Sequence, residues 1–164
     1  MARTEMATLI ALFRQYRKDI TSSVLDDDGV QNIFDQNRFW LDKVVMDRDR
    51  KDGLRFFSPY KYLEDGFTIF DSGDATLTPA SIFPIEGIVV FSTKQDGNAF
   101  IQGFAHNFFY TLSLAMRGII ADDDTWNEIT RGRVKLVRRN YSDQADAYER
   151  MGFLPRTKML QRGG

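Results

Sequence analysis

The sequence predicts an α+β fold, a bundle of about four helices with a small antiparallel β insertion between the second and third helices. Near both ends of the chain, apolar residues recur at helical spacing. The middle third instead contains short β-branched or aromatic segments separated by turn residues. A chain of 164 residues with 43% hydrophobic content can bury a core of its own. We therefore expect a single domain over residues 1–152, with the β insertion at about 54–102, and an extended C-terminal arm over 153–164.

The composition limits the classes of function. The 22 basic and 23 acidic residues give a net charge of −1, so no overall electrostatic attraction to nucleic acid or to a membrane surface is expected. There is no cysteine, which excludes disulfides, thiolate catalysis and zinc–sulfur sites. No apolar run reaches the length of a membrane span, and the early Glu5 and the lack of a small-residue cleavage site speak against a signal peptide.

The first predicted helix begins at Thr4, whose hydroxyl can cap it. Its apolar stripe is expected to face the core, while Arg14, Arg17 and Lys18 face away from it. The stripe consists of Met6, Leu9, Ile10, Phe13, Tyr16 and Ile20. A polar break follows over Thr21–Leu25.

Three acidic residues, Asp26–Asp28, and then Gly29 precede the second predicted helix. Carboxylates at a helix start cap backbone N–H groups and oppose the positive end of the helix dipole. A divalent-cation loop is the alternative interpretation, but the alternating ligand spacing and the closing Glu of a calcium loop are absent. The helix is expected over about Gly29–Met46, with a stripe of Val30, Ile33, Phe34, Asn37, Leu41, Val44 and Val45. Trp40 lies off this stripe, where it either borders the core or anchors a partner.

From Leu54 onward the periodicity changes from helical to extended. The expected strands are Leu54–Phe57, Gly66–Phe70, Thr76–Leu77, Ile85–Phe91 and Ala99–Gln102. The Asp96-Gly97 dipeptide predicts a hairpin between Val89–Thr93 and Ala99–Ile101. The aromatic side chains of these strands are expected on the covered face of the insertion.

The central helix is expected after a sharp turn at Gly103, with Asn107 as its N-cap. Apolar residues on most of its faces indicate that it packs on more than one side. They are Phe108, Leu112, Ala115, Met116, Ile119 and Ile120, with Phe109, Tyr110 and Leu114 on other faces. Asp122–Asp124 end this helix, and Thr125–Arg131 is expected to be a short bridge.

The last predicted helix covers Arg133–Met151 and has a narrow apolar stripe formed by Val134, Val137, Tyr141, Ala145 and Tyr148. Such a helix suits a domain surface or a contact with a neighbouring subunit. The candidates for contacts between subunits are therefore Trp40, Arg138, Arg139, Tyr141 and Tyr148. The basic residues between Arg131 and Arg139 are also the best candidate for nucleic-acid contact, but stacking aromatics are lacking there apart from Tyr141. A solvated helix face, or a face that meets an acidic partner, fits this stretch better.

The C-terminal segment is too short and too basic to form a core, yet it contains several large apolar side chains. Gly152 and Pro155 are expected to end the preceding helix. The arm contains Phe153, Leu154, Pro155, Met159 and Leu160, together with the basic residues Arg156, Lys158 and Arg162. We expect it to be ordered by burial on another subunit or another protein. A disordered end, or one folded over its own domain, is the alternative.

The residues that common catalytic mechanisms need are missing from the sequence. His106 is the only histidine, and beside aromatic neighbours at a helix start it is expected to be packed or hydrogen-bonded. No second His or Cys completes a nucleophile–base pair, and no Gly-rich phosphate loop follows a strand. We therefore expect no enzymatic activity, no cofactor and no metal.

Several residue patterns occur in an order that is typical of one protein family. They are Asp26–Asp28 with Gly29, Asp35 with Arg38, Tyr60 and Tyr62 with Glu64 and Asp65, Phe67–Asp71, Leu77-Thr78-Pro79 before Gly87 and Phe91, Gly103–Asn107, and Ala145, Ala147 and Tyr148. In this order, over nearly its whole length, the chain resembles the head–tail connector adaptor (neck or head-completion) proteins of tailed bacteriophages. It departs from that pattern at His106-Asn107, where Tyr-Asp is expected, and at Phe108–Thr111, where small residues are commoner.

The resemblance implies a structural virion protein without a catalytic site. Such a protein, made in the host cytoplasm, would form a ring in the virion neck, usually dodecameric in this family, between the portal protein and a stopper or tail protein. DNA would pass through the lumen without specific binding, and the C-terminal arm would reach up the portal. A near-neutral charge suits this channel, because clustered Lys and Arg are what make phosphate binding strong. A stopper or tail-completion protein is the alternative within the same class.

A soluble α+β ligand-binding or enzymatic domain is the alternative from a different class. It would use a pocket between the β insertion and the central helix, lined by Tyr60, Tyr62, Phe104 and His106. Tyrosines at such positions either stack on a ligand or close the edge of a small core.

Overall fold

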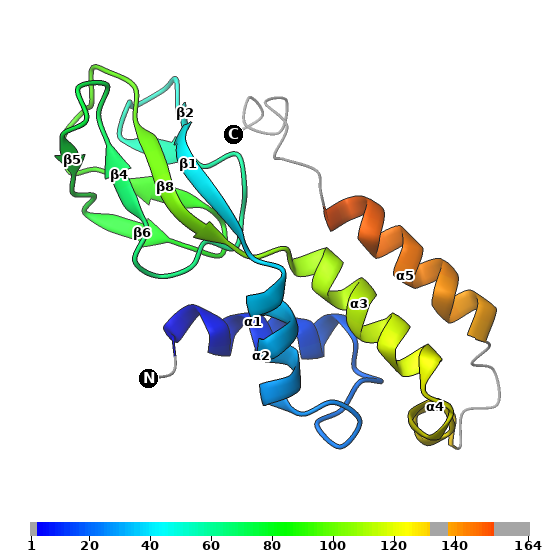
Figure 1. The fold of residues 1–164 in the computed structure, drawn as a ribbon. Coiled ribbons are helices and arrows are strands. Elements are labelled where there is room, and N and C mark those ends of the chain that lie inside the picture. Colours follow the sequence, from blue (N-terminus) through cyan, green and yellow to red (C-terminus); the bar gives the residue numbers. More distant parts are fainter. Residues whose placement is uncertain (1–2, 132–137, 153–164) are drawn as a thin grey trace. The chain divides into compact units, whose positions relative to one another are not determined.

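The computed structural model describes residues 3–131 and 138–152 and confirms an α+β protein. Over these residues the chain forms five helices, with two small four-stranded antiparallel sheets between α2 and α3 (Figure 1). The chain divides into two compact units. Of the described residues, 3–5 and 38–106 form the β unit, and 6–37, 107–131 and 138–152 form the helical unit.

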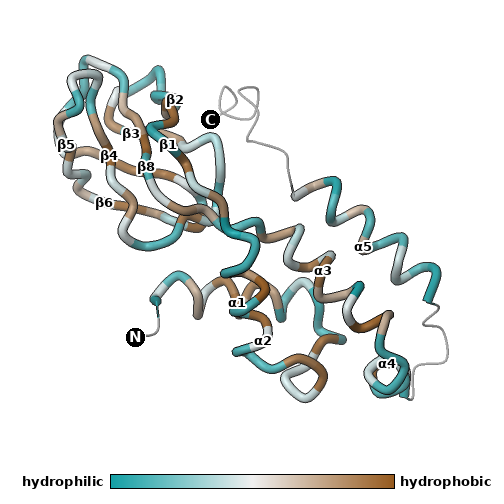
Figure 2. The backbone as a smooth tube through the Cα atoms, in the orientation of Figure 1, coloured by the Kyte–Doolittle hydropathy of each residue, from teal (hydrophilic) through white to brown (hydrophobic). Residues whose placement is uncertain are grey.

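The helical unit is built around α3. The helices of the chain are α1 (Thr4–Tyr16), α2 (Asp27–Gln36), α3 (Phe108–Ala121), α4 (Asp123–Thr130) and α5 (Arg138–Gly152). α3 packs against α2, α4 and α5. Hydrophobic segments recur along α3 in Figure 2, whereas α5 is largely hydrophilic and buries only Tyr141 and Ala145. This confirms the apolar central helix and the narrow stripe of the last one, whose predicted start at Arg133 lies outside the described residues.

Side-chain caps set the starts of three helices. Asp26 accepts a 2.8 Å hydrogen bond from the Gly29 N–H at the start of α2, and Asn107 accepts one of 3.3 Å from Tyr110 at the start of α3. Both caps were expected from the sequence. Asp122 accepts from the N–H groups of the second and third residues of α4. The expected bridge over Thr125–Arg131 is wrong, because this third cap starts a further helix there.

The predicted stripe of α1 is confirmed in its inner part, where Met6, Leu9 and Phe13 are buried together with Ile20 just beyond the helix. Tyr16 is instead 49% exposed, although its ring makes edge contacts with Phe108 and Phe109.

Arg14 and Arg17 do not face away from the core as expected. Arg14 donates hydrogen bonds of 2.7 Å to the carbonyls of Ile20 and Leu25, which lie beyond the end of α1. The Arg17 guanidinium lies 4.8 Å from the centre of the Tyr141 ring and bonds to Asp19. The long apolar stems of both arginines let their charged ends reach these partners along the unit's surface.

The β unit consists of two antiparallel sheets. Sheet A has the order β1 (Phe39–Val45), β8 (Phe100–Ala105), β4 (Thr68–Phe70), β5 (Thr76–Leu77), and sheet B the order β2 (Asp47–Arg48), β3 (Arg55–Phe57), β7 (Ile88–Val90), β6 (Ser81–Phe83). Only Met46 separates β1 from β2, so one extended segment passes from sheet A to sheet B. Each of the five predicted strands overlaps an observed strand.

The second predicted helix is wrong beyond Gln36, because the chain forms β1 where the helix was expected to continue to Met46. The helix ends at Asn37, whose side chain donates to the Ile33 carbonyl. Leu41 and Val44 fit a helical spacing and a strand equally well over so short a run. The aromatic and β-branched composition of Phe39–Val45 favours a strand, which then pairs along β8.

The hairpin predicted at Asp96-Gly97 is wrong. The strands on its two sides, β7 and β8, belong to different sheets. Both edges of β8 are taken by β1 and β4, and β7 lies between β3 and β6. Partner strands from distant parts of the chain therefore outcompete the local turn. The strand β6 was not expected from the sequence.

The core of the β unit lies between the two sheets. It contains Leu41, Met46, Phe56, Leu63, Ile69, Val89, Phe91, Ala99, Ile101 and Ala105. Phe56 and Phe91 make an edge contact there, with ring centres 5.5 Å apart. The expectation that all aromatic side chains lie on the covered face is wrong for Phe100 and Phe104, which alternate with the buried positions of β8 and are only half-buried.

Gly103 lies inside β8 and not at a sharp turn. Its φ is +155°, and a Cβ at this position would come within 2.7 Å of the Phe67 Cβ and 2.9 Å of its Cα. Glycine is needed here because another segment of backbone passes close to it.

Candidate functional site

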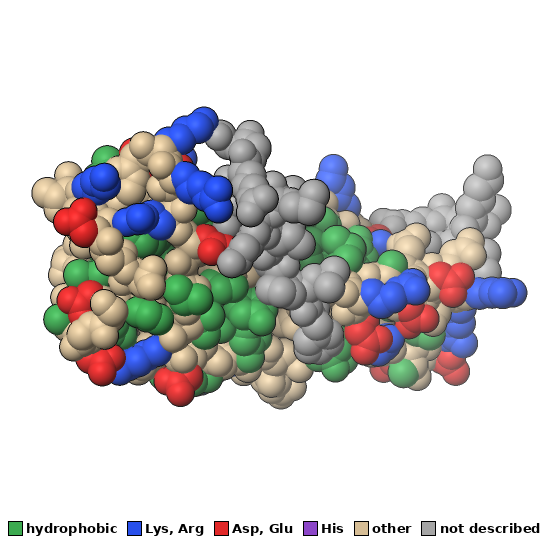
Figure 3. Space-filling view, turned by 90° about the horizontal axis from the view of Figure 1, so that it is seen from above, with side chains coloured by type: hydrophobic (Ala, Val, Ile, Leu, Met, Phe, Trp, Pro, Cys, Tyr) green, Lys and Arg blue, Asp and Glu red, His purple; other side chains and the backbone are tan. Residues whose placement is uncertain are grey.

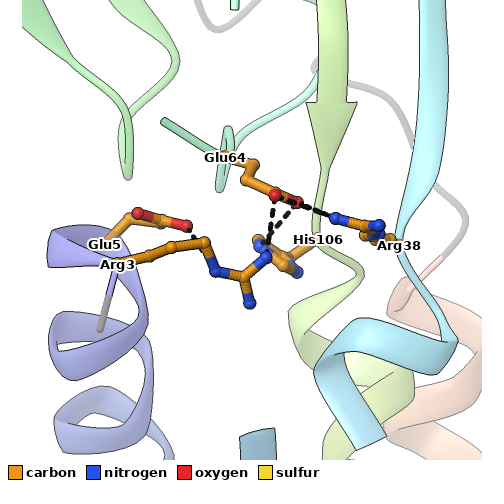
Figure 4. A network of polar contacts seen from close by, with 5 residues as sticks. All are labelled: Arg3, Glu5, Arg38, Glu64 and His106. Atoms are coloured by element: carbon orange, nitrogen blue, oxygen red, sulfur yellow. Dashed lines mark hydrogen bonds and ion pairs between the residues drawn. The ribbon is translucent and has the colours of Figure 1, made fainter. Parts of the chain in front are cut away.

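Glu64 is the centre of a polar network in the β unit (Figure 4). Its carboxylate accepts hydrogen bonds of 2.7 Å from Arg3 and of 2.8 and 2.9 Å from Arg38. The Glu64 side chain is 12% exposed. The two arginines therefore fix the position of this carboxylate.

His106 lies on the same carboxylate. Its Nε2 is 3.6 Å from Glu64 Oε2, and its side chain is fully buried. The His106 N–H donates to the Tyr62 carbonyl at 2.8 Å, and the Glu64 N–H donates to the Phe104 carbonyl at 2.9 Å. These backbone bonds hold the His106 and Glu64 segments side by side. The structure therefore confirms His106 as a packed residue.

Glu5 adds a second buried acid to the network. Its residue is 4% exposed, and its Oε1 lies 3.4 Å from the Arg3 guanidinium. Neither of its carboxyl oxygens has a hydrogen-bond partner within the described part of the chain. Burial, and then the neighbouring Asp65 carboxyl, raise the pKa of Glu5 to about 7. The network thus combines a carboxylate bound by two arginines with a second acid whose pKa lies at about 7.

The geometry of this cluster is that of a structural network. The Glu64 carboxylate is neutralised by two arginines, and the imidazole beside it is enclosed in the β unit. Residues 3–131 and 138–152 contain no group of three or more His, Cys, Asp or Glu arranged to hold a metal ion.

The outer face of sheet A carries a row of aromatic side chains. Trp40 and Phe104 are opposite each other on β1 and β8, with ring centres 4.9 Å apart in an edge contact. The Arg38 guanidinium covers the Phe104 ring at 4.0 Å, and the Lys43 ammonium lies 4.9 Å from the Phe70 ring. Both cations are paired, Arg38 with Glu64 and Lys43 with Asp74. Trp40 remains 50% exposed.

The outer face of sheet B contains a shallow hollow of about 420 Å³. Its lining residues are Arg55, Ser81, Phe83, Glu86, Ile88 and Val90. A second hollow of about 370 Å³ lies along β4, β5 and the segment that leads to β6. Neither hollow is lined by the residues expected for a ligand pocket, namely Tyr60, Tyr62, Phe104 and His106.

Those four residues lie together at one end of the β unit, within its packing. Tyr60 makes an edge contact with Phe39 at 5.0 Å. Tyr62 has a φ of +58°, which a residue with a side chain adopts only at an energetic cost, and its N–H donates to the Ile85 carbonyl. Tyr62 directly precedes Leu63, which bridges to Ala105, and Glu64 follows. No residue pattern predicts this conformation at Tyr62, because Tyr is uncommon in it.

The other candidates for contacts between subunits lie in the helical unit. Tyr141 is fully buried and donates to Asp19 at 3.0 Å. Tyr148 is half-buried and stacks on Phe109 at 6.1 Å. Arg138 and Arg139 are exposed, and Arg138 bonds to Asp123. The expected arm lies outside the described residues, with Phe153, Leu154, Pro155, Arg156, Lys158, Met159, Leu160 and Arg162.

Comparison of the chain with protein-family models, with curated proteins and with solved structures finds no match. Among the described helices, none combines the length and the apolar character that crossing a membrane requires.

Proposed function

We propose that this protein is a structural component of tailed-phage particles, a head–tail connector adaptor. In this role it assembles as a ring, dodecameric as is usual for the family it resembles, between the portal protein and a stopper or tail protein. DNA passes through the lumen of the ring without specific binding. The proposal assigns no catalytic activity and no cofactor to the chain.

One observation carries the proposal, the position of the β structure within the helical fold. Two helices come first, two small antiparallel sheets follow, and the capped central helix α3 begins directly after β8. This is the element order on which the resemblance depends. The acidic cap at Asp26 and the Asn107 cap of α3 lie at the positions that the resemblance uses.

The electrostatics of the chain also support a channel that DNA crosses without being held. The net charge is −1, and the cations at the aromatic face of sheet A are each paired with a carboxylate. Strong DNA binding depends on unpaired Lys and Arg that can neutralise phosphates. A ring with balanced charges avoids that.

Binding to phage particles tests the proposal directly. The purified protein is mixed with portal-bearing, DNA-packaged particles from its own source, which are then pelleted and imaged by negative-stain electron microscopy. Co-sedimentation with new ring-shaped density at the portal vertex is expected. A folded protein that stays in the supernatant and adds no density there would overturn the adaptor assignment. Particles that already carry a complete neck are the control, since their binding site is occupied.

A further inference from the structure

The β unit presents two apolar surfaces that face away from each other. Trp40 and Val45 are both 50% exposed and lie on the outer face of sheet A. Phe83 is 47% exposed and lies on the outer face of sheet B, with Ile82 beside it on the same edge strand. Because the core lies between the two sheets, these surfaces are on opposite sides of the unit.

Trp40 lies close to an exposed acid along β1. Its ring rests edge-on against Phe104, which leaves half of its surface open. Arg38, two residues earlier, lies over the Phe104 ring and is held by Glu64. Asp42, two residues later on β1, is exposed. The tryptophan therefore projects with an exposed anion nearby on the same strand.

The hollow on sheet B has the complementary features. Phe83, Ile88 and Val90 supply apolar lining, and its volume of about 420 Å³ falls in the range of sites that enclose small ligands. Arg55 and Glu86 also line it, so it carries one cation and one anion.

Pairing with the backbone of another strand is disfavoured at the edge strands β1 and β6. The register of β1 shifts between Leu41 and Val44, where Lys43 adopts a φ of +46°. Such bulges with charged side chains block the addition of another strand. The edge strand β6 is three residues long and is followed at once by Pro84, which lacks an N–H group. At these two edge strands, contacts through side chains are therefore favoured over strand pairing.

We propose that the β units of neighbouring copies join head to tail, with Trp40 of one copy inserted into the sheet B hollow of the next. Asp42 then meets Arg55 across the contact. When two copies join through two different surfaces, one surface of each kind stays free on the pair. Further copies can therefore add on, and the assembly closes into a ring when the rotation between neighbouring copies allows it. Ring closure rests on the proposed function, whereas the contact itself does not.

A second copy fits the sheet A face better than a nucleic acid does. Stacking aromatics are present, but Arg38 and Lys43 are both bound to carboxylates, and Asp42 adds a negative charge. On the face drawn in Figure 3, hydrophobic side chains of the β unit lie among acidic and basic ones. Interfaces between proteins have this mixed character, with aromatic anchors at their centre.

The absence of cysteine allows a clean cross-linking test. Gln102→Cys and Ser81→Cys place single thiols on the outer face of sheet A and at the hollow, and neither residue is a charge of the proposed contact. A short bis-maleimide applied to a mixture of the two variants is expected to give heterodimers, and the variant with both thiols is expected to give a ladder of higher oligomers. Lys51→Cys, an exposed loop position of the same unit, replaces Gln102→Cys as the matched control and should give no specific product.

The reaction is run in solution and on protein bound to phage particles. Trp40→Ala, added to the two-thiol variant, is expected to lower the cross-linked yield by about tenfold or more, because it removes the central anchor. Homodimers from Gln102→Cys alone would show a symmetric contact and overturn the proposal. So would the absence of cross-links in both settings. Particle binding without cross-links would support the adaptor function and refute this contact. Cross-links without particle binding would support this contact and refute the adaptor function.

Discussion

The Arg3 guanidinium donates a 2.7 Å hydrogen bond to the Glu64 carboxylate across 61 positions of the chain. It shares that carboxylate with Arg38, which belongs to the segment that begins β1. The bond fastens the N-terminal residues to the β unit, and it does so at a carboxylate that is largely enclosed. Both guanidinium groups therefore share one carboxylate, which ties the N-terminal residues to the start of β1.

Replacing Glu64 with Gln is expected to destabilise the β unit by about 2–3 kcal/mol. The substitution keeps the shape of the side chain but leaves two partly buried arginines without their countercharge, which costs more than losing an exposed ion pair. Denaturant unfolding measures the loss through the fluorescence of Trp40, in a Trp126→Phe background so that the signal comes from the β unit alone. Glu128→Gln, an exposed acid in α4, is the matched control and should change the free energy of unfolding by less than about 0.5 kcal/mol.

Glu5 is expected to make the stability of the protein fall as the pH rises from about 4.5 to about 7. Its pKa is raised to about 7 in the folded chain from an ordinary value of 4.5, so the folded state holds the proton more tightly than the unfolded state. Its stabilising effect is complete below pH 4.5 and is lost as the pH passes 7, by up to roughly 3 kcal/mol. Unfolding curves recorded at several pH values measure the slope.

Glu5→Gln provides the test of that assignment. The neutral amide imitates the protonated acid, so the variant should lack this slope and be more stable than the parent chain at pH 8. At pH 4.5 the two proteins should have similar stability. An unchanged slope in the variant would show that another group causes the pH dependence.

Gly103→Ala is expected to destabilise the β unit by about 2 kcal/mol or more. The added Cβ would meet Phe67 at distances that real atoms do not adopt, and the backbone at this point has a φ of +155°. Gly118→Ala in α3 is the matched control, because a Cβ there meets nothing within 4 Å. That control should stabilise the protein by about 0.5–1 kcal/mol. Thermal unfolding distinguishes the two, and equal effects would contradict the role given to Gly103.

The parts of the fold that were predictable are those governed by local chemistry. Asp26 and Asn107 cap helices because their side chains reach N–H groups three residues away. Tyr141 and Ala145 are buried because one face of α5 is apolar. The wrong predictions concern segments whose conformation depends on distant parts of the chain. β1 becomes a strand by pairing with β8, and the segment with Asp96-Gly97 joins strands of different sheets.

The polar network of the candidate site could not be predicted from the sequence for the same reason. Glu64 lies 26 residues from Arg38 and 61 from Arg3, and no spacing in the sequence relates them. His106 could be assigned to the interior because aromatic residues surround it in the sequence. That it meets Glu64 depends on the backbone bond between His106 and Tyr62, which forms only when the sheet is complete.

His106→Ala is expected to lower the stability of the β unit by about 2 kcal/mol and to leave particle binding intact in the folded protein. The substitution empties a fully buried position beside Glu64, and nothing places the imidazole on a binding surface. The measurement is the free energy of unfolding together with co-sedimentation at a temperature where the variant is folded. Normal stability combined with lost binding would instead give His106 a direct role in assembly.

Deleting residues 155–164 is expected to abolish binding to portal-bearing particles while the melting temperature stays unchanged. The segment has apolar residues that suit a groove and basic residues that suit an acidic rim.

Two variants of full length separate these contributions. In one, Met159 and Leu160 become Ser, and in the other, Arg156, Lys158 and Arg162 become Gln. If burial of the apolar residues dominates, the Met159/Leu160 variant should bind more weakly than the parent chain at all salt concentrations. The variant without the three basic residues should bind more weakly mainly at low salt, where charge attraction is strongest. Undiminished co-sedimentation of the truncated protein would remove the arm from the portal contact.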